Sequence, residues 1–282
     1  MAASRTTKTG RFSCALPAVP AVRARRCISP LLHLCRIIPR LTDLPDVLRR
    51  AIDLVLGFDA GLVHVVALSL GVSVGATAAA SLLGLPLGAA LAVLRFPGRR
   101  GLVLLANALL GLPPVVVGLM LYLLLSRAGP LGGLGLLFTP AAMVLAQFLL
   151  ALPIVAALAH RAADGIWGIY GDDLRVNGAG PLRAIMTVLA IGRAEMLTAI
   201  LAGFGRTISE VGAILVVGGN IAGHTRTMTT SIVLETSRGN LAFALALGSV
   251  LVAISLAVSA TVFALAGRWD RAVPRPPAEP SM

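Results

Sequence analysis

Residues 139–159 read TPAAMVLAQFLLALPIVAALA and contain no charged side chain. A helix of about 20 residues crosses the hydrocarbon core of a bilayer, so this stretch is long enough to span it. Inside lipid every backbone N–H and C=O must find a partner within the segment, which favours a helix over an isolated strand. Thr139 and Pro140 are typical of a helix N-cap followed by proline in the first turn, so we expect the helix to begin there.

Four further apolar stretches lie before and after this one. They cover residues 65–94, 101–126, 196–217 and 241–265. With 57% hydrophobic and 13% charged residues, the chain carries more apolar surface than a soluble core of 282 residues could bury. The sequence therefore predicts an all-α integral membrane protein with about five transmembrane helices.

Prolines and glycines interrupt three of these spans. The first continues without charge from His64 to Leu94, which is about 45 Å of helix. It must therefore tilt, extend into water, or break near Gly84-Leu85-Pro86. The second contains Gly111-Leu112-Pro113-Pro114 and the third contains Pro153, and each proline removes a backbone donor and bends a helix.

The arginines between the spans indicate which ends face the cytoplasm. Ten of them lie in the loop 95–100, the loop 160–195 and the C-terminal end, whereas the two intervening loops hold three. Because cytoplasmic loops are enriched in arginine and lysine, we expect the first three regions inside the cell. Five spans then place the N-terminus outside, although residues 1–40 carry seven arginines, one lysine and no acid.

The chain before the first span divides into two segments. Residues 1–40 form a basic extension that we expect to be disordered, with an Arg-rich targeting segment or a misassigned start as alternatives. Residues 41–60 have apolar side chains at helical spacing, with charged residues between them, which predicts an amphipathic helix on the membrane surface. The frayed start of the first span is the alternative for this second segment.

The chain lacks the residues of an ATP site. A P-loop needs a lysine after a glycine-rich turn, and Lys8, the only lysine, follows no such turn. No HExxH or CxxC occurs, and the three cysteines have no metal-ligand spacing. We therefore expect no catalytic residues, no metal and no cofactor in this chain. Most of the net charge of +12 lies in the N-terminal tail and the loops, so we expect no nucleic-acid partner.

Two charged side chains lie inside the fourth span. Arg206 and Glu210 are four residues apart, so they share a helix face near the middle of the bilayer. A charge at that depth is unfavourable and faces a bundle interior or a watery path. Two interpretations remain open, namely an ion pair that fixes helix packing and a role in a translocation path or its gate.

A polar segment follows this span. Residues 218–230 read GGNIAGHTRTMTT, in which Asn220, Arg226 and Thr229 offer amide, guanidinium and hydroxyl groups. Such donors suit a tetrahedral oxyanion. An ordinary polar extracellular loop is the alternative.

Three stretches carry a family resemblance, namely LPPVVVGL at 112–119, the segment 203–219 that begins GFGRTISEVG, and the segment 219–236 that begins GNIAGHTRTMTT. With them the chain, over residues 58–268, resembles the permease subunit of bacterial ATP-binding-cassette (ABC) importers with the type I, molybdate/methionine-like membrane fold. Within that family it is most similar to tungstate importer permeases. The resemblance implies a permease domain at 61–268, with a coupling loop at 160–195, and a cytoplasmic tail at 269–282.

In that family the coupling loop carries an E-A-A-x-x-x-G motif that docks on the ATPase. The match here is Asp172-Asp173-Leu174 followed by Gly178, so the glycine and one acid are kept while both alanines are lost. The resemblance implies that these residues couple the chain to its ATPase. A glycine at this position permits the turn that ends a short helix.

The resemblance implies the transmembrane subunit of an importer for a tetrahedral oxyanion in the bacterial inner membrane. Tungstate is the expected substrate, and molybdate or sulfate are the alternatives. Two copies would form the pore, ATPase subunits carrying ATP and Mg would bind inside, and a periplasmic or surface oxyanion-binding protein would dock outside. The residues expected along the path are Arg206, Glu210, Asn220, Arg226 and Thr229. A stand-alone secondary transporter or channel is the alternative of another class, and it predicts internal repeats that the sequence does not show.

Overall fold

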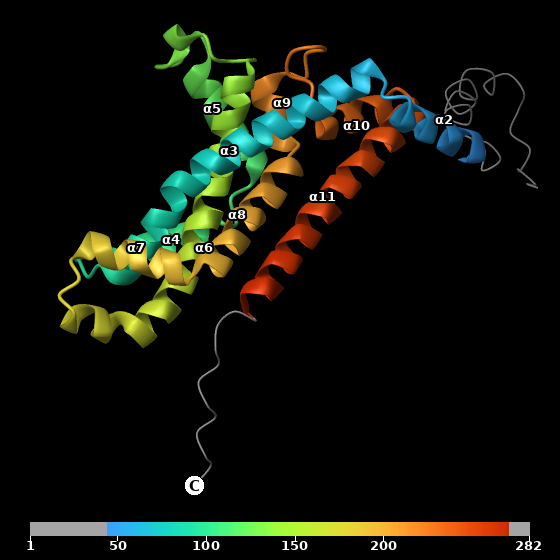
Figure 1. Cartoon of the computed structure of the whole chain (residues 1–282). Coiled ribbons are helices and arrows are strands. Elements are labelled where there is room, and N and C mark those ends of the chain that lie inside the picture. The colour runs from blue at the N-terminus through green and yellow to red at the C-terminus, as the bar shows by residue number, and fades with distance from the viewer. Residues whose placement is uncertain (1–43, 271–282) are drawn as a thin grey trace, which may run out of the picture. The chain divides into compact units, whose positions relative to one another are not determined.

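In the computed structural model of the chain, residues 44–270 are described (Figure 1). The basic extension at residues 1–40 and the tail from residue 271 onward lie outside the described residues. Contacts divide the chain into two units, Met1–Pro45 and Asp46–Met282. The helix packing lies within the second unit.

Regular structure in residues 44–270 is helical, without strands, which confirms the predicted all-α class for this part of the chain. The helices are α2 (Leu44–Leu56), α3 (Ala60–Val93), α4 (Arg99–Leu109), α5 (Pro114–Leu125), the 3-10 turn η2 (Gly132–Leu134), α6 (Pro140–Val176), α7 (Pro181–Ile191), α8 (Arg193–Ile208), α9 (Gly212–Gly218), α10 (Met228–Ser237) and α11 (Leu241–Asp270).

Helices α3 and α6 make the most extensive contact in the bundle. On α3 a row of buried small residues recurs every four positions, and it consists of Ala76, Ala80, Gly84, Gly88 and Ala92. Without larger side chains in the way, two helix backbones approach closely. Helix α3 continues unbroken through Pro86, so a break near residue 86, one of the three alternatives for this long span, is absent. Its contacts with α6 flank the proline on both sides and outweigh the one lost hydrogen bond.

The second predicted span, 101–126, is two helices instead of one. Helices α4 and α5 meet at 104° across residues 110–113. Pro113 is extended, with φ −65° and ψ 122°, and Pro114 begins α5. A residue before proline is kept out of the α-helical region, and neither proline can donate a backbone hydrogen bond. The two consecutive prolines therefore end α4 and set a new helix direction.

The third span begins as predicted, because the Thr139 hydroxyl accepts a hydrogen bond from the N–H of Ala142 and Pro140 occupies the first turn. Helix α6 then continues to Val176, far beyond the expected end at residue 159. Residues 160–195, expected as a loop, therefore consist mainly of the last part of α6 and helix α7. These two helices form a hairpin that turns at residues 177–180.

The fourth predicted span, 196–217, is also divided. Helix α8 ends at Ile208 and α9 begins at Gly212, while α7 and α8 meet at 80° near Gly192. Within the described residues, α3, α6 and α11 are each long and apolar enough to cross a membrane. The total is up to five spans if the bent pairs α4–α5 and α7–α8 each form one.

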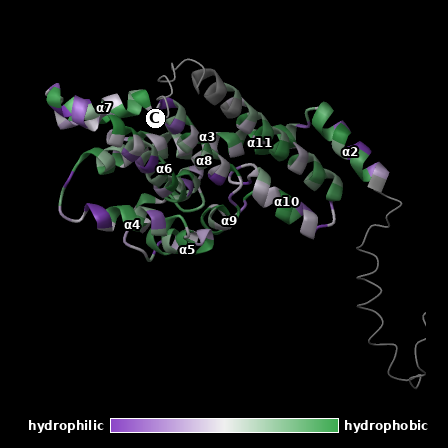
Figure 2. Cartoon of the chain, turned by 90° about the horizontal axis from the view of Figure 1, so that it is seen from below, coloured by the Kyte–Doolittle hydropathy of each residue, from purple (hydrophilic) through white to green (hydrophobic). Residues whose placement is uncertain are grey.

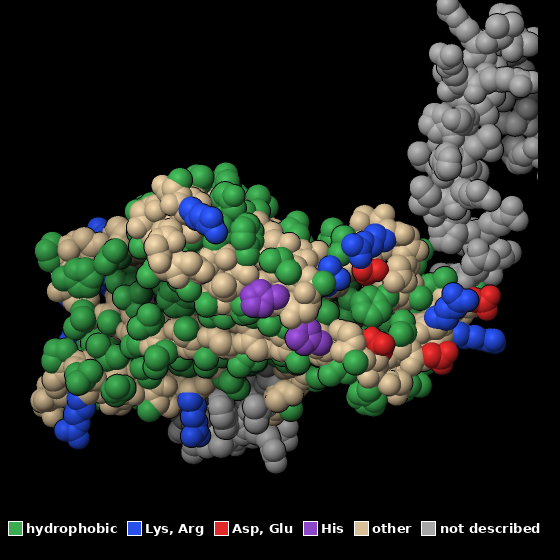
Figure 3. Space-filling model, turned by 90° about the horizontal axis from the view of Figure 1, so that it is seen from above, with side chains coloured by type: hydrophobic (Ala, Val, Ile, Leu, Met, Phe, Trp, Pro, Cys, Tyr) green, Lys and Arg blue, Asp and Glu red, His purple; other side chains and the backbone are tan. Residues whose placement is uncertain are grey.

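Large apolar side chains cover the outer faces of several helices. On α5 the exposed residues include Leu119, Met120 and Leu123, and on α11 they include Val252 and Leu256. Figure 2 shows hydrophobic residues along α2 and α5 and hydrophilic ones at the ends of α4 and near α7. In Figure 3 hydrophobic side chains spread over the face seen from above, with acidic side chains toward one end and Lys or Arg side chains at several places around the molecule. Such exposed apolar faces suit contact with lipid.

Candidate translocation and coupling sites

Arg206 and Glu210 form an ion pair at the end of helix α8. Nη1 of Arg206 lies 2.8 Å from Oε2 of Glu210, and the two side chains are 33% and 3% exposed. Sequence reasoning placed both on one continuous helix. The structure corrects this, because α8 ends at Ile208 and Glu210 lies in the break before α9. The pair still forms because the backbone N–H of Glu210 bonds to the carbonyl of Thr207, which keeps the first residues of the break near the helix.

Glu210 is held by several neighbours besides Arg206. Its Oε1 accepts a hydrogen bond from the N–H of Ala213 (3.1 Å), which lies in the first turn of α9. Its backbone carbonyl accepts a hydrogen bond from the hydroxyl of Thr229 (2.9 Å) on α10. Arg206, Glu210 and Thr229 therefore form one connected group that joins α8, α9 and α10.

Asn220 and Arg226 lie in the loop between α9 and α10. The hydroxyl of the fully buried Thr225 donates to the carbonyl of Gly218 and accepts from the N–H of Ile221, which closes the loop. Oδ1 of Asn220 and Nε of Arg226 are buried without a hydrogen-bond partner among the described residues. The Thr225 hydroxyl therefore bonds to the backbone of its own loop. Asn220 and Arg226 each have a buried polar atom that forms no hydrogen bond with the described residues.

Helix α3 contains a buried row of hydroxyl groups that was not predicted from the sequence. It consists of Ser69, Ser73, Thr77 and Ser81, spaced four residues apart. The hydroxyl of Thr77 lies 3.1 Å from that of Thr207 on α8, and Nε2 of Gln147 on α6 donates to the carbonyl of Thr207 (2.8 Å). Small hydroxyl residues spaced four apart in an apolar helix lie on one face of that helix. This spacing is the sequence signal from which the row could have been predicted.

A second feature that sequence reasoning missed is the composition of the uncovered face of α8. Its most exposed positions are Arg193, Glu195, Thr198, Ala202 and Gly205, and Ser209 follows at the helix end. None of these is a large apolar residue, in contrast to the exposed faces of α5 and α11. A face of small and polar side chains in a spanning helix suits water or another protein chain better than lipid.

The predicted coupling residues lie at the tip of the α6–α7 hairpin. Asp172 and Asp173 are exposed in the last turns of α6, and Leu174 is partly buried. The N–H of Ala179 bonds to the carbonyl of Leu174 and the N–H of Gly178 to that of Arg175, at 2.9 and 3.0 Å. Gly178 has φ +68°. This is a Schellman motif, in which glycine adopts the left-handed conformation that ends a helix.

The hairpin is tied to the start of the second span by two polar contacts. Arg99, at the beginning of α4, pairs with Asp164 of α6 at 2.9 Å. Arg161 of α6 donates to the side-chain oxygen of Asn107 on α4 at 2.7 Å. These two contacts link α4 to the part of α6 that leads into the hairpin.

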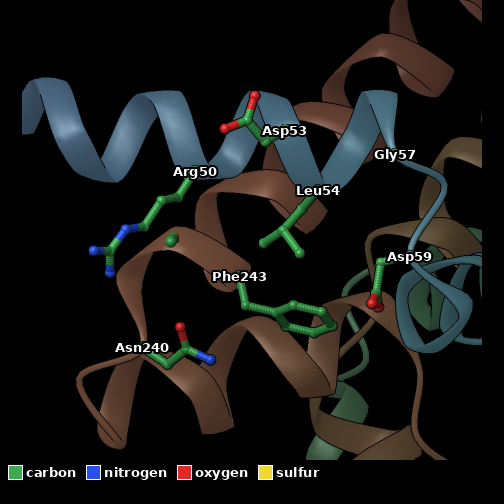
Figure 4. Close-up of a pocket in the computed structure, with 8 residues that line it drawn as sticks. Arg50, Asp53, Leu54, Gly57, Asp59, Asn240 and Phe243 are labelled. Carbon is green, nitrogen blue, oxygen red and sulfur yellow. The ribbon is translucent and has the colours of Figure 1, made fainter.

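Two hollows border helix α2, and neither includes a predicted path residue. One, of about 630 Å³, has the polar lining residues Arg50, Asp53, Asp59 and Asn240 (Figure 4). Asp59 is already used there, because its Oδ1 caps α3 by accepting from the N–H of Leu62. The other, of about 750 Å³, is almost wholly apolar and lies between α2, α10 and α11. We therefore base the candidate site on α8 and its neighbours.

Comparison with known proteins decides the family. No family model matches the chain. The chain is 39% identical over 217 residues to the tungstate uptake system permease protein of Peptoclostridium acidaminophilum, and the match covers 77% of this chain and 95% of that protein. It is 41% identical over 204 residues to a probable anion ABC transporter permease protein of Haloferax volcanii, covering 71% and 88%. The chain belongs to the permease family of ABC transporters.

This ABC permease is thus a multi-pass membrane subunit and not an enzyme, as the sequence predicted. It is also 35% identical over 129 residues to the molybdenum transport system permease protein of Azotobacter vinelandii, a match that covers 43% of the ABC permease and 57% of that protein. Permeases named for tungstate and for molybdenum are therefore among its relatives. The roles of Asp172, Asp173, Leu174 and Gly178 in coupling, and of the five path residues, stay predictions.

Proposed function

We propose that this ABC permease is the transmembrane subunit of an importer for a tetrahedral oxyanion, with tungstate as its substrate. The observation that carries the proposal is its 39% identity to a tungstate uptake permease across 95% of that protein's length. A match of that extent covers nearly the whole relative, so it favours a shared task as well as a shared fold.

The composition of α8 supports a path along this helix. A dianion leaves its hydration shell reluctantly and needs polar groups wherever it crosses the hydrocarbon zone. The uncovered face of α8 offers Thr198, Ser209 and the partly exposed Arg206. This face is open in the single chain, and we propose that a second copy of the permease closes it to form the pore.

The α6–α7 hairpin supports a coupling role. It projects Asp172 and Asp173 at its exposed tip and is joined to α4 through Arg99 and Asp164. We propose that a separate ATPase, which binds ATP and Mg, docks on this hairpin from the cytoplasm. An oxyanion-binding protein would deliver substrate on the opposite side. Closure of two ATPases would draw the hairpins of two permeases together.

Elemental uptake tests the proposal. Cells that lack their own oxyanion importers would express the permease with an ABC ATPase and an oxyanion-binding protein from the same source organism. Tungsten, molybdenum and sulfur accumulation would be measured by mass spectrometry, with cells lacking only the permease as the control. We expect tungsten accumulation that depends on the permease and that survives an excess of sulfate. No permease-dependent uptake of any oxyanion would show the proposal to be wrong.

Molybdate is the second candidate, because a molybdenum permease is among the relatives at 35% identity. Tungstate and molybdate are dianions of the same shape, so the permease residues alone offer little to separate them. Competition in the same assay decides between them. Accumulation of molybdenum that excess tungstate does not reduce would assign the permease to molybdate.

A further inference from the structure

The unequal burial of Arg206 and Glu210 points to an exchange of partners during transport. We infer that the guanidinium of Arg206 leaves Glu210 to bind the passing oxyanion and returns to Glu210 when the anion moves on. This inference rests on the proposed function, because it assigns an anion-binding residue within the proposed path.

The two members of the ion pair are held very differently. Glu210 is 3% exposed, and its other carboxylate oxygen is fixed by the N–H of Ala213. Arg206 is 33% exposed, and Glu210 is the one partner of its side chain among residues 44–270. Arg206 can therefore swing away without breaking any backbone contact, whereas Glu210 cannot follow it.

The space beside Arg206 allows an anion to approach. Gly205 lies on the same uncovered face of α8, and a Cβ added there would meet nothing within 4 Å. On the other side of the pair, a Cβ at Gly212 would lie 2.6 Å from the side chain of Val115. Val115 of α5 therefore packs closely beside the Glu210 end of the pair, whereas the side chain of Arg206 remains 33% exposed.

Charge explains why the exchange is reversible. A planar guanidinium binds two oxygens of an oxyanion through parallel N–H bonds, and a dianion offers more charge than one carboxylate. Once the anion leaves, a lone cation in the bundle would be unfavourable, so Arg206 returns to Glu210. Because the Glu210 carboxylate competes with the oxyanion for Arg206, it limits how tightly Arg206 binds the substrate.

The test uses the permease in complex with its ATPase and binding protein, reconstituted in proteoliposomes. The variants are Arg206→Gln, Arg206→Lys, Glu210→Gln and the double variant Arg206→Gln/Glu210→Gln. Arg238→Gln is the matched control, because it removes another intrachain pair, that with Glu235 at 3.3 Å on α10. Permease abundance, tungstate uptake and ATPase activity would be measured for each.

We expect Arg206→Gln to lower the maximal uptake rate by about tenfold or more, the size expected for one charge-assisted hydrogen bond. Binding-protein-stimulated ATP hydrolysis should remain, because the coupling hairpin is intact, and Arg206→Lys should recover part of the rate. The double variant should regain normal abundance without regaining uptake, since it contains no unpaired charge. Arg238→Gln should transport like the wild type.

Two results would overturn the inference. One is wild-type uptake by Arg206→Gln at normal abundance. The other is recovery of both abundance and uptake in the double variant, which would leave the pair with a purely structural role. If the wild-type complex itself moves no oxyanion, the proposed function fails and this inference fails with it. If the wild-type complex does transport the oxyanion, either of the two results above contradicts this inference alone and leaves the proposed function standing.

Discussion

Gly88 of α3 lies directly against the backbone of α6 at Ala156. A Cβ at position 88 would come within 2.5 Å of the carbonyl oxygen of Ala156 and within 2.8 Å of the N–H nitrogen of His160. Helix α6 is the helix that continues into the proposed coupling hairpin. The absence of a side chain at Gly88 therefore fixes how closely the base of that hairpin is held to the centre of the bundle.

Gly88→Ala should destabilise the permease by about 1–3 kcal/mol, because the added methyl group must push two helix backbones apart. The measurement is thermal unfolding of the purified protein in detergent. Gly71→Ala is the matched control on the same helix, since a Cβ there would meet nothing within 4 Å. The control should unfold at or slightly above the wild-type temperature. Equal unfolding temperatures for Gly88→Ala and the wild type would contradict the close contact.

Ser69→Ala should also destabilise the fold, by about 1–3 kcal/mol. The Ser69 hydroxyl accepts the N–H of Met228 at 2.7 Å, and both residues are buried, so alanine would leave that N–H without a partner. Ser255→Ala on α11 is the control, because its hydroxyl bonds only within its own helix, to Leu251. The same thermal assay applies. A Ser69→Ala protein as stable as the control would mean that water or another group satisfies Met228.

Gly178→Val should abolish uptake while leaving the permease in the membrane. Its φ of +68° is unfavourable for any residue with a Cβ, and more so for a β-branched one. The turn at the hairpin tip would change shape, and the docking surface proposed for the ATPase would be lost. Gly168→Val, on an exposed part of α6 with nothing within 4 Å of an added Cβ, is the control. Normal uptake and normal stimulated ATP hydrolysis in Gly178→Val would remove this turn from the coupling mechanism.

Labelling of single cysteines tests the sidedness predicted from the loop arginines. In a cysteine-free background, Arg100→Cys and Gly180→Cys should resist a membrane-impermeant thiol reagent in intact cells and react after lysis. Ala222→Cys, in the exposed part of the loop before α10, should react in intact cells. Reaction at position 180 from outside would overturn both the topology and the coupling assignment.

Sequence alone located the apolar segments, the helix start at Thr139 and Pro140, and the turn at Gly178. Each depends on interactions within a few neighbouring residues, such as the Thr139 hydroxyl with the N–H of Ala142. The stretches at 112–119, 203–219 and 219–236 together also indicated the family, because a motif is recognised from the order of its residues and does not require their neighbours in space. Local chemistry of this kind is fully contained in the sequence.

Only the tertiary structure decided where the spans break and which polar groups meet. Hydropathy treats 101–126 and 196–217 as single helices, because a break of a few residues barely changes the average over a span. Whether Pro86 breaks its helix depends on the contacts of α3 with α6, and Gly88, two residues after the proline on α3, lets the two helices make those contacts. Likewise the hydrogen bonds of Glu210 to Thr229 and of Thr77 to Thr207 join segments whose approach is set by packing rather than by sequence spacing.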